Sequence, residues 1–336
     1  MTDQGLIKKL LNDPSSAVDE MLESILNAHV DLLSAAGNRA VARAVPAPSG
    51  KVGIALGGGS GHEPAFLGYV GPGLADSAAV GNVFAAPSPD SIVASIEAAD
   101  LGAGVILLYG NYSGDVLNCR LAIRSATARG LDVRSVFVAD DVASASADQR
   151  DRRRGIAGEV LVFKAAGAAA DSGRCLDEVE RIARKANDAI GSMGVALSGA
   201  ELPGARRPVF ESPAGQMEVG LGVHGEPGVR RAPLGTADQV GQMLVETIVP
   251  DIGIAAGDDV VVLVNGLGAT TAMEQHLVHR AATAALTALG VTIHRSYVGE
   301  YVTSLQMSGL SVTLMKLDDE LRDLIDRPAH SLGWRA

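Results

Sequence analysis

The sequence predicts an α/β fold with two domains, the first built on a largely parallel sheet with flanking helices and the second on a more mixed sheet. The 336 residues exceed what one ordinary hydrophobic core organises, so two domains are expected. In the first half, short continuous apolar runs alternate with amphipathic helical patterns, as they do in parallel α/β sheets. Beyond this half, glycine and proline separate the strand-like runs, so we place the domains at 1–188 and 189–336.

The first domain begins with a helical pattern over about 14–36, in which apolar residues recur at helical spacing. A helix with Ser88 as its N-cap follows, and another extends from Asp115 to Gly130. A long helix over 175–191 completes the domain. The strand-like runs that alternate with these helices are 51–56, 78–84, 104–110 and 133–141.

The second domain contains two helical patterns, at 237–249 and at about 271–289. Its strand-like runs are 193–197, 217–224, 229–234, 259–267, 291–301 and 310–317. Several of these runs follow one another without an intervening helix, which predicts antiparallel pairing within a mixed sheet.

The composition is that of a folded protein with an acidic surface, with 47% hydrophobic residues, 20% charged residues and a net charge of −11. Such a surface repels phosphate backbones and anionic membranes, so we expect neither nucleic acid nor membrane as a partner. Cys119 and Cys175 fall within apolar helical patterns and no CxxC motif occurs, which favours a reducing compartment. No stretch has the pattern of a signal peptide or membrane span, so we expect a cytoplasmic protein.

A glycine-rich stretch, LGGGSGHEP at 56–64, follows the first strand-like run. It lacks the lysine with which a P-loop reaches the β and γ phosphates, and His62 replaces the third glycine of a dinucleotide fingerprint. A tight turn from strand to helix would by itself explain the glycines. A histidine at the carboxyl end of a parallel strand, beside glycines that let a ligand approach the backbone, favours a ligand site.

A second polar stretch, YGNYSGDVLNC, begins at the end of the strand-like run 104–110. Asp115 is explained as an N-cap, because aspartate is a favoured residue at that position. The spacing alone favours this cap, but the role of a general base stays open, because a carboxylate at the end of a neighbouring parallel strand can face the same crevice as His62.

A third stretch, MEVGLGVHGEPGV at 217–229, places His224 between glycines and close to Glu226. A structural role and a ligand role are equally compatible with this pattern. A metal site formed by His62, His224 and the neighbouring glutamates is disfavoured, because no HxxxH or CxxC spacing occurs, and we expect no metal. The remaining five histidines are interpreted as structural.

The segments GGGSGHEP, NYSGDVLN, GVHGEPG, NGLGATT and TSLQMSGLSVTLMKLDDE occur in the order seen in the dihydroxyacetone kinase K subunit. The chain resembles that family over nearly its whole length, from about residue 10 to 334. The resemblance implies a phosphotransferase acting on an alcohol group, the glycerone kinase reaction of glycerol metabolism. Members bind short-chain ketones such as dihydroxyacetone and phosphorylate a terminal hydroxyl.

The resemblance also implies site residues. The histidine of HGEPG falls on His224, which attacks the carbonyl carbon of the substrate and holds it as a hemiaminal. The aspartate of NYxGD falls on Asp115, which accepts the proton of the reacting hydroxyl, and the histidine of GGGSGHEP falls on His62, which orients that hydroxyl. The residues implied to bind the substrate are Gly58, Gly59, Ser60, Gly61, Gly110 and Asn111.

The family also implies a partner, because its nucleotide sits on a separate L-type domain or subunit. We therefore expect no cofactor on this chain. An L subunit is expected to carry ATP with Mg²⁺, or ADP that a phosphotransferase-system protein rephosphorylates. The family forms homodimers, so we expect a homodimer here.

Two positions depart from the family pattern. Gly110 stands where the best-known members have a lysine that points at the substrate, which leaves room for a four-carbon ketose such as erythrulose. Gln306 stands where an aspartate is common, and the sequence offers no account of it.

Two other classes of function compete with the kinase. A ketone-binding transcriptional coactivator of the same family is one, and it is disfavoured because such relatives tend to lose the catalytic residues that this chain retains. A carrier of a lipid or another carbonyl compound is the other, and an acyl chain needs no nucleophilic imidazole.

Overall fold

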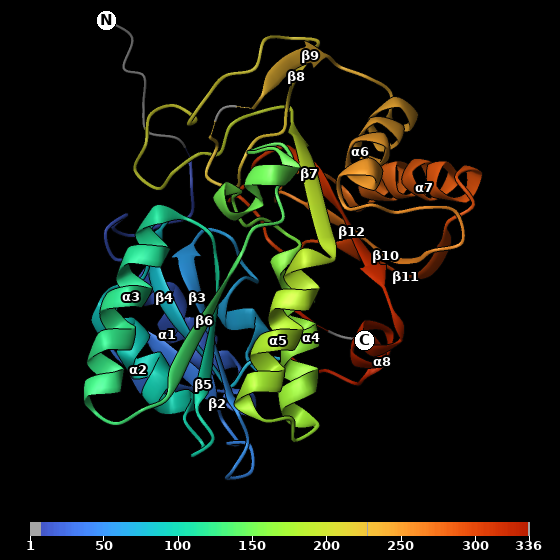
Figure 1. Cartoon of the computed structure of the whole chain (residues 1–336). Coiled ribbons are helices and arrows are strands. Elements are labelled where there is room, and N and C mark those ends of the chain that lie inside the picture. Colours follow the sequence, from blue (N-terminus) through green and yellow to red (C-terminus); the bar gives the residue numbers. More distant parts are fainter. Residues whose placement is uncertain (1–7, 227, 335–336) are drawn as a thin grey trace, which may run out of the picture.

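The computed structural model, which describes residues 8–226 and 228–334, contains two six-stranded sheets (Figure 1). The first sheet has the order β1-β2-β4-β3-β5-β6. Strands β4, β3, β5 and β6 pair in parallel, and β1 and β2 form an antiparallel hairpin at the edge beside β4. The strands are β1 (Leu33–Gly37), β2 (Ala40–Arg43), β3 (Gly53–Ser60), β4 (Ser77–Val83), β5 (Val105–Gly110) and β6 (Val133–Val138).

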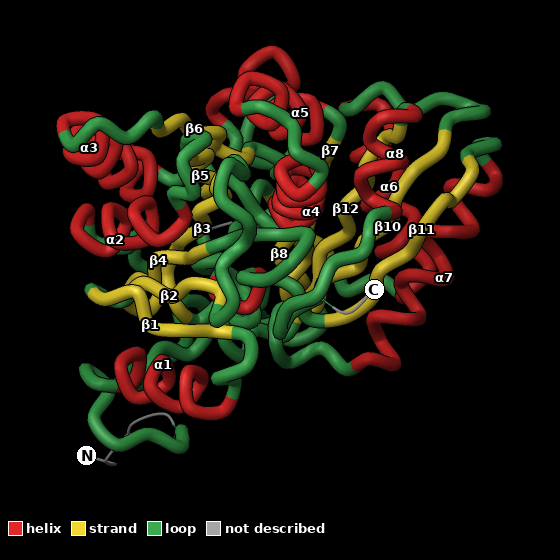
Figure 2. The backbone as a smooth tube through the Cα atoms, turned by 90° about the horizontal axis from the view of Figure 1, so that it is seen from below, coloured by secondary structure: helices red, strands yellow, loops and turns green. Residues whose placement is uncertain are grey.

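Helices cover both faces of the first sheet (Figures 1 and 2). Helices α2 (Pro89–Ala99) and α3 (Ser113–Ala128) pack on one face, and α4 (Glu159–Asp171) and α5 (Leu176–Asp188) pack on the other. Helix α1 (Ala17–Ala28) lies beside the β1–β2 hairpin. Two short 3₁₀ helices, η1 (Leu67–Tyr69) and η2 (Ala147–Arg152), lie in connections.

The central strands bury side chains on both faces, as the continuous apolar runs predict. Ile54 and Leu56 of β3 pack toward α4, whereas Ala55 packs toward α2 and α3. This alternation follows from the two-residue period of a strand, and all three side chains are fully buried. The interior position of β3 places its carboxyl end between those of β4 and β5.

The second sheet has the order β11-β10-β12-β7-β8-β9, and within it β10 and β11 pair in parallel while the other neighbours pair antiparallel. Helices α6 (Ala237–Asp251) and α7 (Ala272–Ala288) cover one of its faces, and α8 (Asp319–Asp326) follows β12. The predicted fold class is confirmed. The strands are β7 (Ile190–Ala196), β8 (Gln216–Val219), β9 (Arg230–Pro233), β10 (Asp259–Gly266), β11 (Thr292–Gly299) and β12 (Gly309–Leu317).

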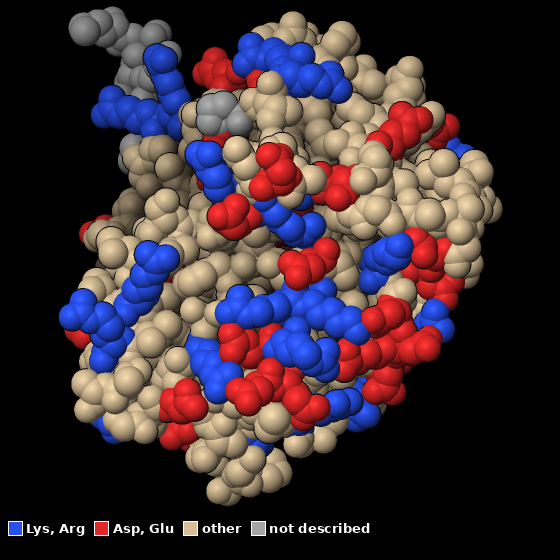
Figure 3. Space-filling view, viewed as in Figure 1, with Lys and Arg blue, Asp and Glu red and all other residues tan. Residues whose placement is uncertain are grey.

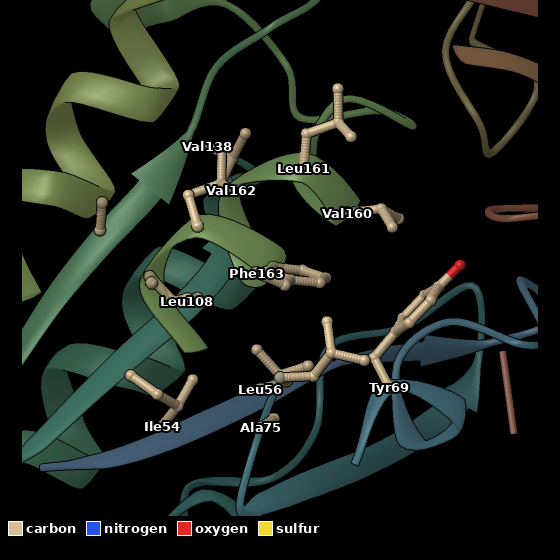
Figure 4. Close-up of a cluster of buried hydrophobic side chains, with 14 of the residues drawn as sticks. Ile54, Leu56, Tyr69, Ala75, Leu108, Val138, Val160, Leu161, Val162 and Phe163 are labelled. Carbon is tan, nitrogen blue, oxygen red and sulfur yellow. The ribbon is translucent and has the colours of Figure 1, made fainter. Parts of the chain in front are cut away.

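Helix α4 is buried on all sides because it lies between the two sheets. Figure 4 shows Phe163 of α4 pointing toward Tyr69, in one cluster with Leu56 of β3 and Leu108 of β5. The same apolar cluster continues through residues of β10, β12 and α8. The chain passes from the first sheet to the second between Asp188 and Ile190, and the core on the two sides is shared.

The N-terminal region differs from its prediction, because α1 ends at Ala28 and the β1–β2 hairpin replaces the rest of the expected helix. The hairpin turns through Gly37, Asn38 and Arg39, all with positive φ values that a right-handed helix cannot contain. The prediction for Cys175 was also wrong: it is the exposed N-cap of α5, whereas Cys119 is buried in α3.

The face seen in Figure 3 carries lysine and arginine side chains mixed with acidic ones, most densely over α5. Ion pairs such as Arg181–Glu320 join α5 to α8, so much of this charge is neutralised locally. None of the helices in the described part of the chain is long and apolar enough to cross a membrane.

Candidate functional site

A cavity lies where β3 and β5, two neighbouring parallel strands, reach their carboxyl ends. His62 follows β3, and Asp115 follows β5 in the first turn of α3. Both residues line the cavity, so the prediction that they face one crevice is confirmed. Open α/β sheets bind ligands at this edge because the connections there leave space beyond the strands.

The second half of the chain closes the cavity from the opposite side. His224 lies in the segment after β8, and its ring is 4.8 Å from the ring of His62, centroid to centroid. Val302 lines the cavity as well, and the backbone N–H groups of Thr303 and Leu305 donate hydrogen bonds to carbonyls in the loop after β3. The structure therefore brings His62, Asp115 and His224 into one cavity.

Gly57, Gly58 and Gly59 belong to β3, which continues through Ser60, so a turn from strand to helix does not explain these three glycines. Gly57, Gly58 and Gly59 line the cavity. A Cβ atom added to Gly58 would be 1.9 Å from the ring of Phe66, which also lines the cavity. The absence of a side chain at Gly58 thus lets an aromatic ring approach the strand.

His62 is almost completely buried, and its hydrogen bond fixes which ring nitrogen carries the proton. Its Nδ1 lies 2.7 Å from the carbonyl oxygen of Thr303, so Nδ1–H donates and Nε2 is left unprotonated. Nε2 is buried without a partner among the described residues. Burial, together with the nearby charge of His224, lowers the pKa of His62 to about 3, so the ring is neutral at physiological pH.

Asp115 does not cap α3, because the N-cap is Tyr112 and Asp115 is inside the first turn, so the capping prediction was wrong. Its Oδ1 is buried and accepts no hydrogen bond from the described part of the chain. Burial raises the pKa of Asp115 to about 7, and the charge of His224 opposes part of this rise. A carboxylate with such a pKa is suited to accept a proton near neutral pH.

His224 is held by Glu226, two residues further along the loop. The backbone N–H of His224 donates to Oε2 of Glu226 at 3.0 Å, and Nδ1 lies 3.1 Å from Oε1. Burial alone would raise the pKa of Glu226, but the hydrogen bond from His224 and the charges of His224 and Arg154 lower it to about 2. An ionised carboxylate only accepts hydrogen bonds, so Nδ1 of His224 carries a proton, and in the neutral form of this tautomer Nε2 has the free lone pair.

Aromatic rings surround the two histidines. Phe84 stacks on His62 with a centroid separation of 4.9 Å and an interplanar angle of 12°. Tyr112 packs edge-on against His224 at 4.6 Å. These contacts restrict the imidazole rings, and the free space left in the cavity is about 20 Å³, enough for about one water molecule.

The other predicted substrate-binding residues divide into two groups. Gly58, Gly59 and Gly110 line the cavity. Ser60 and Asn111 do not line it. The Ser60 hydroxyl donates to the Gly81 carbonyl, and the Asn111 amide donates to two carbonyls of the 151–153 segment. Gly61 does not line it either, and its N–H donates to the Glu63 carboxylate.

Glu159, which was not predicted as a site residue, lines the cavity from the start of α4. An acidic residue in the first turn of a helix is expected for electrostatic reasons, so its presence gave no signal of a site. Gln306, which had no explanation, accepts a hydrogen bond from Lys9 at 2.7 Å and donates one to Glu201. It therefore ties the N-terminal segment to the second half of the chain.

The described residues contain no group of three or more histidine, cysteine, aspartate or glutamate side chains arranged to hold a metal ion. The polar groups that line the cavity instead include a neutral imidazole, a carboxyl group of raised pKa and a second imidazole aligned by a glutamate. This set can bind a polar organic molecule, attack an electrophilic carbon and accept a proton.

Comparison with known proteins identifies relatives of the whole chain. The family model described as the Dak1 domain matches residues 23–333. The chain is 43% identical over 324 residues to the dihydroxyacetone-binding subunit DhaK of PTS-dependent dihydroxyacetone kinase 2 from Listeria innocua, covering 96% of this chain and 97% of that one. It is 45% identical over 330 residues to an L-erythrulose 1-kinase from Mycolicibacterium smegmatis, covering 97% of this chain but 58% of that one.

Solved structures show the same fold. The dihydroxyacetone kinase of C. freundii in complex with AMP-PNP and Mg²⁺ superposes with a TM-score of 0.89 and 30% identity, over 97% of this chain and 60% of that one. The dihydroxyacetone kinase operon co-activator DhaQ superposes with a TM-score of 0.88 and 31% identity, over 94% and 97% of the two chains. The fold is therefore shared by an enzyme and by a co-activator, and the site residues have to distinguish them.

Proposed function

The chain belongs to the Dak1 domain family, and from this premise we propose that it is the substrate-binding and catalytic K subunit of a dihydroxyacetone-type kinase. It binds a short-chain ketone and serves the transfer of a phosphoryl group to the terminal hydroxyl of that ketone. One observation carries the proposal: His62, Asp115 and His224 line the same cavity, and Nε2 of His62 and Oδ1 of Asp115 have no hydrogen-bond partner among the described residues.

His224 binds the ketone covalently. Its Nε2 lone pair attacks the carbonyl carbon, the C=O π bond breaks, and the carbonyl oxygen takes up a proton from solvent to give a hemiaminal. The imidazole then carries a positive charge, which the ionised Glu226 stabilises through its contact with Nδ1. Glycerol has no carbonyl and is rejected by this chemistry.

Asp115 accepts the proton of the hydroxyl that receives the phosphoryl group. The pKa of about 7 makes Asp115 a stronger base than His62, whose pKa is about 3. The unprotonated Nε2 of His62 accepts a hydrogen bond from the same hydroxyl before transfer and so orients its oxygen. His62 is therefore a positioning group for the reacting oxygen, and Asp115 is the base.

Substrate entry requires the cavity to widen, because about 20 Å³ is too small for a three-carbon ketone. The segment that carries His224 is the part suited to move. Gly220 and Gly225 in this segment both have positive φ values, and glycine changes its backbone conformation at low cost.

We propose further that residues 1–188 and 189–336 are separate domains, with the cavity at their junction.

The phosphoryl donor resides on another chain in this proposal. The glycine-rich segment has no phosphate-binding lysine, and most of its glycines are part of strand β3 and not of a phosphate-binding loop. An L-type subunit supplies the nucleotide, either ATP with Mg²⁺ or an ADP that a phosphotransferase-system protein rephosphorylates, and the K subunit forms a homodimer. Two free cysteines suit the reducing cytoplasm, where we place the complex.

Dihydroxyacetone is the first candidate substrate, and a four-carbon ketose such as erythrulose is the second. The second is favoured by Gly110, which puts no side chain into the cavity, and by the identity to an L-erythrulose 1-kinase. A co-activator role like that of DhaQ is the third candidate. Retention of His62, Asp115 and His224 in one cavity favours the enzyme over the co-activator.

Covalent binding is tested by ¹³C NMR with dihydroxyacetone labelled at its carbonyl carbon. We expect the protein to move the labelled signal from the carbonyl region to that of a tetrahedral carbon. The His224→Ala variant loses the new signal, whereas His276→Ala, which removes an exposed imidazole from α7, retains it. Absence of the signal in the unmodified protein, or its persistence in His224→Ala, would refute the hemiaminal.

Turnover is tested by adding an L-type subunit and ATP, or the phosphotransferase-system donor, and comparing dihydroxyacetone with both enantiomers of erythrulose. The enzyme proposal predicts phosphorylation of at least one ketose and none of glycerol. A protein that forms the tetrahedral adduct but transfers no phosphoryl group from any of these donors would instead be a ketone-binding protein of the co-activator kind.

A further inference from the structure

Glu159 is a buried acid for which the proposed mechanism has no use. Its side chain lies at the first position of α4, is 2% exposed and lines the cavity together with Asp115 and Gly110. Its carboxyl group forms no hydrogen bond or ion pair with the described part of the chain. A buried carboxyl group without a partner is costly unless a ligand provides one.

The backbone that carries Glu159 is held firmly by Asp140, which follows β6. One carboxylate oxygen of Asp140 accepts from the N–H of Ile156 at 2.7 Å, and the other accepts from the N–H of Gly158 at 2.8 Å. A Cβ atom added to Gly158 would be 2.5 Å from the second of these oxygens, so the loop packs tightly against the carboxylate. Glu159 is therefore presented to the cavity by a fixed support.

Asp115 and Glu159 place two carboxyl groups around the same small space. Burial raises the pKa of Glu159 well above its ordinary value, and the charges of Asp140 and Asp115 raise it further. An ionised Asp115 thus disfavours ionisation of Glu159, as in sites where two carboxyl groups take different roles. A protonated carboxyl group both donates and accepts a hydrogen bond, which matches a hydroxyl group of a ligand.

The space beside Glu159 is open because position 110 is glycine. A Cβ atom added to Gly110 would lie 3.3 Å from Oε2 of Glu159 and 3.4 Å from the ring of Tyr112. A longer side chain at this position would contact the Glu159 carboxyl group directly. Gly110 and Glu159 together therefore form one polar end of the cavity at the carboxyl end of β5.

We infer that Glu159 is a specificity-determining residue, whose carboxyl group hydrogen-bonds the hydroxyl on the arm of the ketose that is not phosphorylated. The inference rests on the proposed function. His62 and Asp115 bind the hydroxyl that receives the phosphoryl group, and His224 binds the carbonyl carbon between the two arms. Glu159 then selects ketones with a polar second arm over ketones with a methyl group there.

The test removes the proposed hydrogen bond in two ways, by removing the hydroxyl group of the ligand and by removing the carboxyl group of Glu159. Hydroxyacetone keeps the carbonyl and one hydroxyl of dihydroxyacetone but has a methyl group on its second arm. We measure kcat/KM for dihydroxyacetone, erythrulose and hydroxyacetone, with an L-type subunit and the donor it uses, for the unmodified protein and for Glu159→Ala. The ratio of kcat/KM for the ketose to kcat/KM for hydroxyacetone should fall about tenfold in Glu159→Ala. The value for the ketose falls because the hydrogen bond is lost, whereas the value for hydroxyacetone stays nearly the same.

Two further variants separate this role from a structural one. Glu159→Gln keeps a neutral donor and acceptor and should retain the ratio within about threefold. Glu178→Ala removes an exposed carboxylate from the first turn of α5 and should leave all three rates unchanged. The affinities for the three ketones, measured by titrating the ¹³C adduct signal, should show the same pattern without any phosphoryl donor.

The outcomes distinguish this inference from the proposed function. An unchanged ratio in Glu159→Ala, or an equal loss with all three ketones, overturns the role of Glu159 while the kinase proposal stands. An unmodified protein that forms no adduct and phosphorylates none of the three ketones overturns both.

Discussion

Replacing Asp115 with asparagine is expected to stabilise the fold while it abolishes the proposed catalytic function. The carboxyl group has a pKa of about 7 in the native protein, compared with an ordinary value of 3.8. Burial causes this rise because an ionised carboxylate loses its hydration, and Oδ1 has no partner in the described residues to replace the lost water. Asparagine has nearly the same shape and no charge, so it avoids this cost.

The expected magnitude follows from the two pKa values. Between pH 3.8 and about 7 the native state binds more protons at this group than the unfolded state does, so the stability provided by the protonated form is lost as pH rises. The difference in pKa corresponds to about 4 kcal/mol of unfolding free energy. We expect about 2 kcal/mol in practice, because water and side chains adjust around the carboxylate. The advantage of Asp115→Asn should be near zero at pH 4 and complete above pH 7.

The assay is urea denaturation followed by circular dichroism at several pH values from 4 to 8, with Asp115→Asn and the unmodified protein side by side. Asp90→Asn is the matched control, because Asp90 is an exposed aspartate in the first turn of α2. The control should lose up to about 1 kcal/mol at neutral pH, since it removes a favourable charge from a helix N-terminus.

The same variant should lose turnover by about 10² to 10⁴-fold, the usual contribution of a general base. In the unmodified protein, the rate should rise with pH through about 7 as Asp115 ionises. Two results would refute the argument that burial raises the pKa of this carboxyl group. Asp115→Asn would be less stable than the unmodified protein at pH 8, or the difference in stability would not change with pH.

Two further predictions concern Glu226 and Lys164. Glu226→Gln should weaken ketone binding about tenfold in an NMR titration, because a neutral amide stabilises the imidazolium of the His224 adduct less than a carboxylate does; an unchanged affinity would show that the carboxylate charge is not needed. Lys164 is buried in α4, and burial lowers its pKa to about 8. Above that pH the unfolded state binds more protons at this group than the native state does, so the stability of the protein should rise between pH 8 and 10. Lys164→Met should remove this rise in a denaturation series, and a variant that keeps it would show that another group is responsible.

Much of the fold could be predicted from the sequence because its signals are local. Strands such as β5 are continuous apolar runs, and α2 begins at a serine followed by proline, a pattern that caps a helix wherever it occurs. The β1–β2 hairpin was missed because its alanine-rich strands have weak preferences of their own. Its turn residues adopt positive φ values that the helical pattern of the neighbouring segment concealed.

The sequence by itself determined which groups have the chemistry of the site: two histidines, an aspartate and the glycines beside them occur in short motifs that retain their meaning without the fold. Only the tertiary structure decided their states. Thr303, 241 residues from His62, fixes the tautomer of its ring. The burial that raises the pKa of Asp115, and the supports that bring Glu159 into the same cavity, come from residues scattered along the chain. Desolvation and hydrogen bonding depend on everything packed around a group, and no local pattern encodes that.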